Sequence, residues 1–96
     1  MNKEEIKSKL NKNMALLEKK YHIKKMGLFG SVARGEQEEK SDIDILVEFS
    51  APIGLFDFMR LENFLSEMLG GKVDLVSKKS VKPMLEKYIS RDLIYV

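Results

Sequence analysis

Cysteine is absent from this chain of 96 residues, which excludes disulfides and thiolate metal sites. Any bound metal would have to be held by oxygen atoms or by the single histidine, His22. The chain also lacks an uninterrupted apolar run of about 18 residues, and its first residues lack the apolar stretch of a signal peptide. We therefore expect a cytoplasmic protein without a membrane partner, and we assign His22 no role beyond the surface or a helix cap.

The chain has little net charge, because 17 basic residues nearly balance 15 acidic ones. This balance is too even to argue for a nucleic-acid partner by itself. The charges are unevenly distributed, since residues 1–25 carry eight lysines and three glutamates whereas residues 26–70 carry nine acidic and three basic groups. A solvated surface explains most such patterns, but acids gathered around short strands are also what a divalent-cation site requires. The length and the 44% hydrophobic content suit one compact domain over residues 1–96.

Hydrophobic periodicity predicts two long helices. Apolar residues recur at steps of three or four between Ile6 and Tyr21, which indicates one amphipathic helix over residues 3–21. A second stripe of the same period runs from Leu55 to Met68 and ends at Gly70-Gly71, where a left-handed cap is typical.

A third helix is predicted from Ser80 or Pro83 onward, because serine favours the cap and proline the first helical turn. We expect its buried side to carry Leu85, Tyr88 and Ile89. Tyr95, in the closing extended segment 93–96, is also expected to pack in the core.

Three short apolar segments read as strands, at residues 23–29, 42–49 and 72–77. A short helical segment is expected over residues 31–34, followed by a polar loop at residues 37–41. Helices and strands therefore alternate, and we predict one α+β domain in which helices pack against a small mixed β-sheet.

Potentially reactive residues fall at the ends or starts of these strands. Gly30-Ser31 follows the first strand, Asp42 and Asp44 open the second, and Asp74 lies in the third. Each feature alone has an ordinary explanation, because a Gly-Ser pair can be a turn with a helix cap and a lone acid can be surface charge. Their occurrence together on three successive strands favours a functional site.

The three carboxylates predict a metal site. Asp42 and Asp44 share a face of a strand because side chains at i and i+2 point the same way. Like charges at such a site repel by an amount of order 4 kcal/mol per close pair at an effective dielectric constant near 20. Mg²⁺ prefers oxygen ligands and commonly shares them with substrate phosphates, so we expect Asp42, Asp44 and Asp74 to bind Mg²⁺, in a two-ion arrangement.

The Gly-Ser turn predicts a phosphate site. Gly30 lets the backbone come close to a phosphate, and amides at the start of the following helix point toward it. The Ser31 hydroxyl can donate one more hydrogen bond. Such a turn would bind the β and γ phosphates of a nucleoside triphosphate and leave the α phosphorus near the carboxylates.

The stretch LFGSVARGEQEEKSDIDILVEF resembles the minimal nucleotidyltransferase (MNT or MntA-like) family of the DNA polymerase β-like superfamily. Gly30-Ser31, ten residues and then Asp42-Ile43-Asp44 match its Gly-Ser…Asp-x-Asp signature, and the resemblance extends over essentially the whole chain. It implies that Ser31 with Gly30 holds the triphosphate and that Asp42 and Asp44 bind metal. It also implies that Asp74 helps to activate the acceptor.

Two further expectations come from this resemblance. Arg34 falls where the family usually has arginine, and it either touches a phosphate of the ATP or braces the turn through Glu36. Family members are often antitoxins paired with a HEPN-domain toxin, and some transfer AMP from ATP to a tyrosine of that toxin. A partner protein that supplies the acceptor hydroxyl suits a chain in which we expect no second domain.

Other functions stay open at this point. The chain could neutralise a toxin by masking it, with an incidental nucleotidyl site, or it could transfer a nucleotide to a small molecule. Nucleic-acid binding would use the lysines Lys3, Lys7, Lys19, Lys20, Lys24 and Lys25. We do not favour it, because Tyr21, the aromatic residue among these lysines, belongs to the apolar stripe of the helix and is not left to stack on bases.

Overall fold

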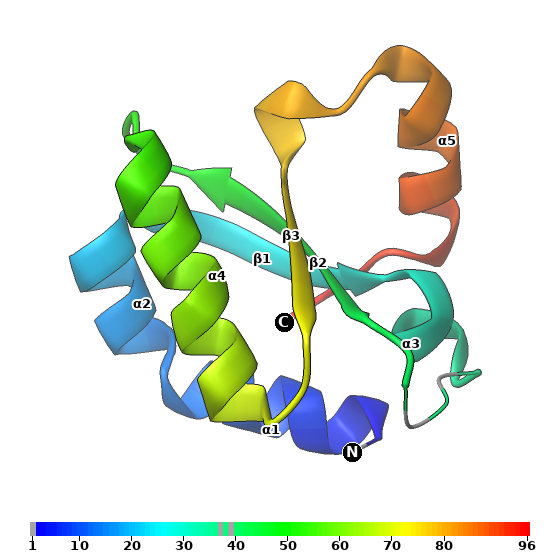
Figure 1. The fold of residues 1–96 in the computed structure, drawn as a ribbon. Helices are drawn as coiled ribbons and strands as arrows, with labels where there is room; N and C mark the ends of the chain where they lie inside the picture. Colours follow the sequence, from blue (N-terminus) through cyan, green and yellow to red (C-terminus); the bar gives the residue numbers. More distant parts are fainter. Residues whose placement is uncertain (1, 37, 39) are drawn as a thin grey trace.

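A four-stranded mixed β-sheet, in the order β3-β2-β1-β4, forms the centre of the fold (Figure 1). The computed structural model describes residues 2–36, 38 and 40–96. Along the chain the elements are α1 (Lys3–Lys12), α2 (Met14–Tyr21), β1 (Ile23–Phe29), α3 (Gly30–Arg34), β2 (Ile43–Phe49), α4 (Leu55–Leu69), β3 (Val73–Ser77), the 3-10 turn η1 (Lys78–Ser80), α5 (Pro83–Asp92) and β4 (Ile94–Tyr95). The predicted α+β class is confirmed, and β1, β2 and β3 begin and end within one residue of their predicted bounds.

The strand directions bring distant segments to one edge of the sheet. β1 pairs antiparallel with β2, and β2 pairs parallel with β3. The end of β1 therefore lies beside the starts of β2 and β3. β4 extends the sheet beside β1, which confirms a final extended segment.

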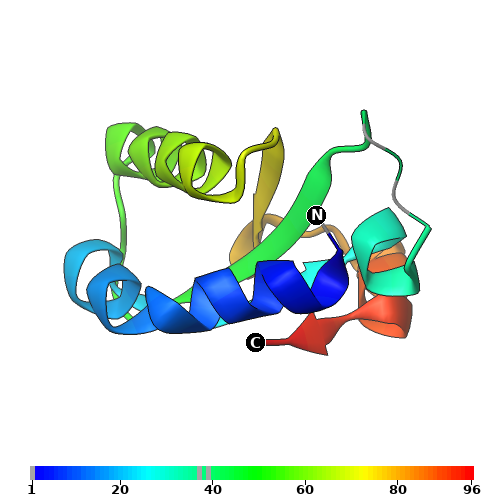
Figure 2. The same ribbon diagram turned by 90° about the horizontal axis from the view of Figure 1, so that it is seen from below.

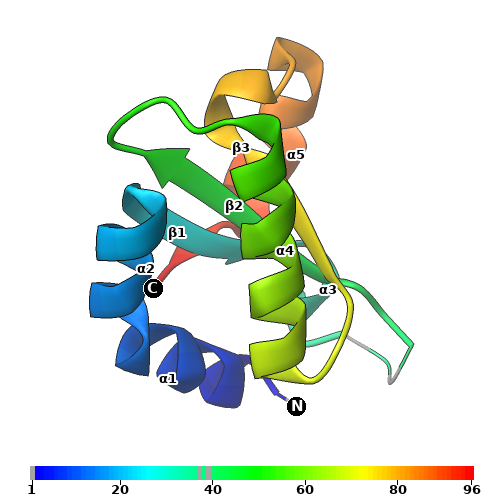
Figure 3. The ribbon, with the colours of Figure 1, turned by 60° about the vertical axis from the view of Figure 1, so that its left-hand side comes forward.

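The helices α1, α2 and α4 cover one face of the sheet (Figure 3). In β2, Ile43, Ile45 and Val47 point into the hydrophobic cluster beneath these helices, as the alternation predicts. Leu46 points to the opposite face, where it is buried and lines a small hollow together with Ile89 of α5. Asp44 is two residues before Leu46 and therefore points to the same face of the sheet, opposite the main core.

The predicted helix over residues 3–21 is in fact two helices, and this prediction was wrong. α1 ends at Lys12 and α2 begins at Met14, with a change of direction between them (Figure 3). Asn13 causes the break, because its backbone N–H bonds to the Leu10 carbonyl and its side-chain amide bonds to the Lys9 carbonyl at 2.8 Å. The bend lets the apolar stripes of both helices face the sheet, and these stripes persist across it: Ile6, Leu10, Leu17 and Tyr21 are all buried.

The expected burial of α5 was largely wrong. Ile89 is buried, but Leu85 is 52% exposed and Tyr88 is 64% exposed. Tyr95, also expected in the core, is 48% exposed and lies beneath the Lys25 ammonium group. α5 contacts the rest of the molecule mainly through its C-terminal part, next to α3, so its N-terminal turns have little to pack against (Figure 2).

Among the described residues, no helix combines the length and apolar character needed to cross a membrane. His22 caps the C-terminus of α2 in the left-handed conformation, with a φ of 56°, which is one of the two ordinary positions, surface or helix cap, expected for it. Of the predicted loop at residues 37–41, positions 37 and 39 lie outside the described residues. Within the rest of that segment, the Ser41 hydroxyl oxygen accepts a hydrogen bond from the Glu38 N–H at 2.9 Å.

Candidate active site

Sheet register places the predicted site residues in one row. Asp44 of β2 pairs with Phe29 of β1 on one side and with Asp74 of β3 on the other. Gly30 follows Phe29 directly, so the Gly-Ser turn lies beside Asp44. Asp44 is half-buried, whereas Asp74 is exposed. The structure therefore brings Gly30, Asp44 and Asp74 together, as the sequence predicted.

Gly30 is required by its conformation and by its closeness to Asp44. Its φ of +70° lies in the left-handed region, which side chains other than glycine rarely adopt. A Cβ atom at this position would collide with the Asp44 carboxylate. The turn is therefore shaped so that backbone and carboxylate approach closely. Ser31 lies inside α3, whose N-cap is Phe29, so the alternative in which Ser31 merely caps a helix is not what the structure shows.

The environment of Asp44 disfavours its charged form. Burial raises the pKa of the Asp44 carboxyl, which reaches about 6 against an ordinary 3.8. The negative charges of Asp74 and then Asp42 raise this pKa as well, and so does a side-chain hydrogen bond with Asp74. The positive charge of Arg34 lowers it. Asp44 is thus held next to like charge in a place where a cation would relieve the repulsion.

This pKa predicts how stability depends on pH without divalent cations. The folded-state pKa of Asp44 lies above 3.8, so its contribution to stability is complete below about pH 4 and is lost as the pH rises through about 6. Because Asp44 is only half-buried, solvent screening limits the loss to about 1 kcal/mol. Urea unfolding in a chelator, at several pH values, should show this fall in the wild type and not in Asp44→Asn. Parallel pH profiles for the two proteins would contradict the assignment.

The three carboxylates are near one another but do not converge on one point. The Asp42 carboxylate pairs instead with the Lys72 ammonium group, with Oδ2 3.9 Å from Nζ. Among residues 2–36, 38 and 40–96, no three His, Cys, Asp or Glu side chains are already grouped as metal ligands. The three groups are nevertheless coupled, because Asp42 and Asp74 both raise the pKa of Asp44, and all three carry the oxygen donors that Mg²⁺ prefers. The side chain of Asp42 is 44% exposed.

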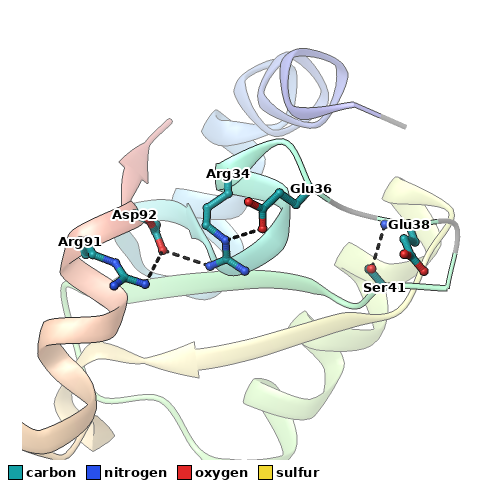
Figure 4. A network of polar contacts seen from close by, with 6 residues as sticks. All are labelled: Arg34, Glu36, Glu38, Ser41, Arg91 and Asp92. Carbon is teal, nitrogen blue, oxygen red and sulfur yellow. Dashed lines mark hydrogen bonds and ion pairs between the residues drawn. The ribbon is translucent and has the colours of Figure 1, made fainter.

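Arg34 braces the turn rather than reaching outward (Figure 4). Its Nε donates to Glu36 Oε2 at 3.0 Å, and its Nη1 donates to Asp92 Oδ2 at 3.1 Å. The hydrogen bonds to Glu36 and then to Asp92 raise the pKa of Arg34, which stays charged. The contact with Glu36 was one of two predicted alternatives. The contact with Asp92, from α5, was not predicted, because no local pattern links residues that are 58 positions apart.

Solvent reaches the site through Asp74. A separate groove of about 590 Å³ lies at the opposite ends of β2 and β3, lined by residues 48–53 and 77–80, and it contains none of the predicted site residues. Asp74 is exposed beside Asp44, so the carboxylates can be reached by an acceptor as large as another protein.

A small mixed sheet that presents an Asp-x-Asp strand to a Gly-Ser turn defines a nucleotidyltransferase. The chain belongs to the nucleotidyltransferase domain family, whose model matches residues 6–96. Within that family it is a minimal nucleotidyltransferase, so the resemblance recognised in its sequence is confirmed.

Relatives and solved structures agree with this assignment. A Methanocaldococcus jannaschii protein named "putative protein adenylyltransferase" is 50% identical over 93 residues, covering 96% of this chain and 95% of its own. The protein adenylyltransferase MntA of Thermococcus cleftensis is 42% identical over 93 residues, covering 97% and 94%. A solved "putative minimal nucleotidyltransferase" is 35% identical with a TM-score of 0.83, covering 98% of this chain and 95% of the other. A crystal structure of a toxin–antitoxin with AMP-PNP is 29% identical with a TM-score of 0.76, covering 88% and 69%.

Proposed function

We propose that this chain transfers AMP from ATP to a hydroxyl of a partner protein, in a Mg²⁺-dependent reaction, and that the partner is a HEPN-domain toxin for which the chain is the antitoxin. The observation that carries the proposal is the register pairing of Asp44 with Asp74 beside the Gly30 turn. The names of the relatives support AMP transfer, and the toxin–antitoxin structure with AMP-PNP supports nucleotide binding in a complex of this kind. A cytoplasmic location stays a prediction from the sequence.

The residues take distinct roles in this proposal. Gly30 and Ser31 bind the triphosphate, and the Asp42, Asp44 and Asp74 carboxylates hold Mg²⁺, which when bound supplies charge stabilisation at the phosphates. The acceptor hydroxyl loses its proton, its oxygen bonds to the α phosphorus, and pyrophosphate leaves.

Asp74 is the exposed carboxylate of the pair, so it is placed to take the proton of a hydroxyl that approaches from solvent. Arg34 acts indirectly, because its guanidinium already binds Glu36 and Asp92. It keeps the turn in place and supplies positive charge near Asp44.

Transfer can be tested directly with ATP labelled on the α phosphate. The chain would be incubated with Mg²⁺ and labelled ATP, with and without a HEPN-domain partner protein, and the label followed by gel and intact mass. We expect label on the HEPN-domain protein only when both proteins and Mg²⁺ are present. A tight complex that never acquires label, under any metal or nucleoside triphosphate, would instead favour an antitoxin that acts by masking.

A further inference from the structure

Two side chains of α4 bind the outer edge of β3, the strand that carries Asp74. β3 is an edge strand, paired with β2 on one side only. On its other side the Val73 N–H donates to the Ser66 hydroxyl oxygen at 3.0 Å, and the Leu75 N–H donates to Glu62 Oε2 at 3.0 Å. Both contacts are partly buried, where a hydrogen bond is stronger than in water. The two backbone groups that flank Asp74 are therefore both tied to α4.

The spacing of the two side chains matches the spacing of the two amides. Glu62 and Ser66 are four residues apart on a helix, which is about 6 Å along its axis. Val73 and Leu75 are two residues apart on a strand, which is about 6.6 Å. After a short turn β3 runs back beside α4 (Figure 3). Glu62, which comes first in the helix, therefore meets the amide of Leu75, which comes second in the strand.

Ser66 is itself held in one orientation. Its hydroxyl donates to the Glu62 carbonyl at 2.9 Å while its oxygen accepts from the Val73 N–H. Its own carbonyl accepts from the Gly71 N–H at 3.2 Å, in the turn that leads into β3. These two hydrogen bonds hold the Ser66 side chain in one rotamer. They also set the position of β3 along the axis of α4.

We propose that Glu62 and Ser66 are positioning residues that hold Asp74 in place opposite Asp44. Asp74 needs such support because β3 is the edge strand of the sheet in the order β3-β2-β1-β4. Displacement of a reacting group by about 1 Å can lower a rate by about 100-fold. The inference rests on the proposed function for the role of Asp74. The attachment of β3 to α4 does not depend on that function.

Four variants of the full chain separate positioning from general stability. Glu62→Ala and Ser66→Ala each remove one acceptor, whereas Glu62→Gln keeps an amide oxygen that can accept from the Leu75 N–H. Glu67→Ala, at an exposed position on the same helix, is the matched control. Each variant would be measured for amide hydrogen exchange at Val73 and Leu75, and for kcat and the KM for ATP in AMP transfer to the HEPN-domain protein.

We expect Glu62→Ala and Ser66→Ala to speed exchange at the amide that each contacts. We expect them to lower kcat by about 10- to 100-fold while the KM for ATP changes by less than about twofold. Glu62→Gln should restore most of kcat, and Glu67→Ala should resemble the wild type. Equal losses in Glu62→Gln and Glu62→Ala, or an unchanged kcat despite faster exchange, would overturn the positioning role.

The two proposals fail in different ways. An inactive wild type would contradict the proposed function. Amide hydrogen exchange at Val73 and Leu75 would then be the test of the attachment of β3 to α4. Unchanged protection of Val73 and Leu75 in Ser66→Ala and Glu62→Ala would overturn the attachment whether or not the wild type transfers AMP.

Discussion

Asp44→Asn is expected to abolish AMP transfer while leaving the metal-free protein at least as stable as the wild type. The carboxylate is half-buried and lies next to the charge of Asp74, so its ionised form destabilises the fold above about pH 6. An amide of the same shape removes that charge and should raise the free energy of unfolding by about 1 kcal/mol at about pH 8. Loss of this proposed ligand for Mg²⁺ should remove several kcal/mol of transition-state stabilisation, which corresponds to about 10³-fold or more in rate.

Asp42→Asn is the matched control for Asp44→Asn. We expect it to lose transfer as well, but with little change in metal-free stability, because the ion pair of Asp42 with Lys72 is exposed and worth little. Chemical unfolding in a chelator and transfer of labelled AMP measure the two properties separately. A large loss of metal-free stability in Asp44→Asn would contradict the charge assignment. A variant that still neutralises the toxin without transferring AMP would show masking.

Gly30→Ala is expected to impair both folding and transfer. Alanine at a φ of +70° is strained, and its Cβ would displace the Asp44 carboxylate. Together the strain and the overpacking should lower the free energy of unfolding by about 2–4 kcal/mol. Because Asp44 is pushed from its place beside Asp74, transfer should fall by at least about 100-fold in the fraction that still folds.

Gly35→Ala separates the two causes. Gly35 has nearly the same backbone conformation, with a φ of +72°, but no atom of the described residues lies within 4 Å of a Cβ placed there. Thermal unfolding should show only the conformational strain, about 1 kcal/mol, and transfer should stay within about twofold of the wild type. Equal losses of activity in the two variants would mean that the collision with Asp44 is not what matters at Gly30.

The acceptor is the part of the proposal that depends most on the surface of the molecule. Asp74 is exposed, and the groove at residues 48–53 and 77–80 lies at the other ends of β2 and β3. A protein that presents a hydroxyl can therefore reach the Asp74 carboxylate from solvent. This exposure supports a protein acceptor.

The carboxylate pair illustrates how much of a site a linear pattern can predict. Asp44 and Asp74 each lie at a recognisable place on an apolar strand, so the sequence predicted both residues and the edge at which they meet. Their direct pairing depends on the register between β2 and β3, which is set by packing across the sheet. The raised pKa of Asp44 follows from that register and from burial, so it could only be found in the folded molecule.

By itself the sequence determined the α+β class, the bounds of the three longer strands and the family, and it supplied the Gly-Ser and Asp-x-Asp residues of the candidate site. Those features depend on local periodicity and on residues close together along the chain, so a linear pattern can predict them. Only the tertiary structure decided the break at Asn13, the exposure of Leu85 and Tyr88, the contact of Arg34 with Asp92, and the attachment of β3 to Glu62 and Ser66. Each of these depends on which surfaces meet after folding, because a hydrogen bond or a buried face between distant residues exists only once the intervening elements have packed.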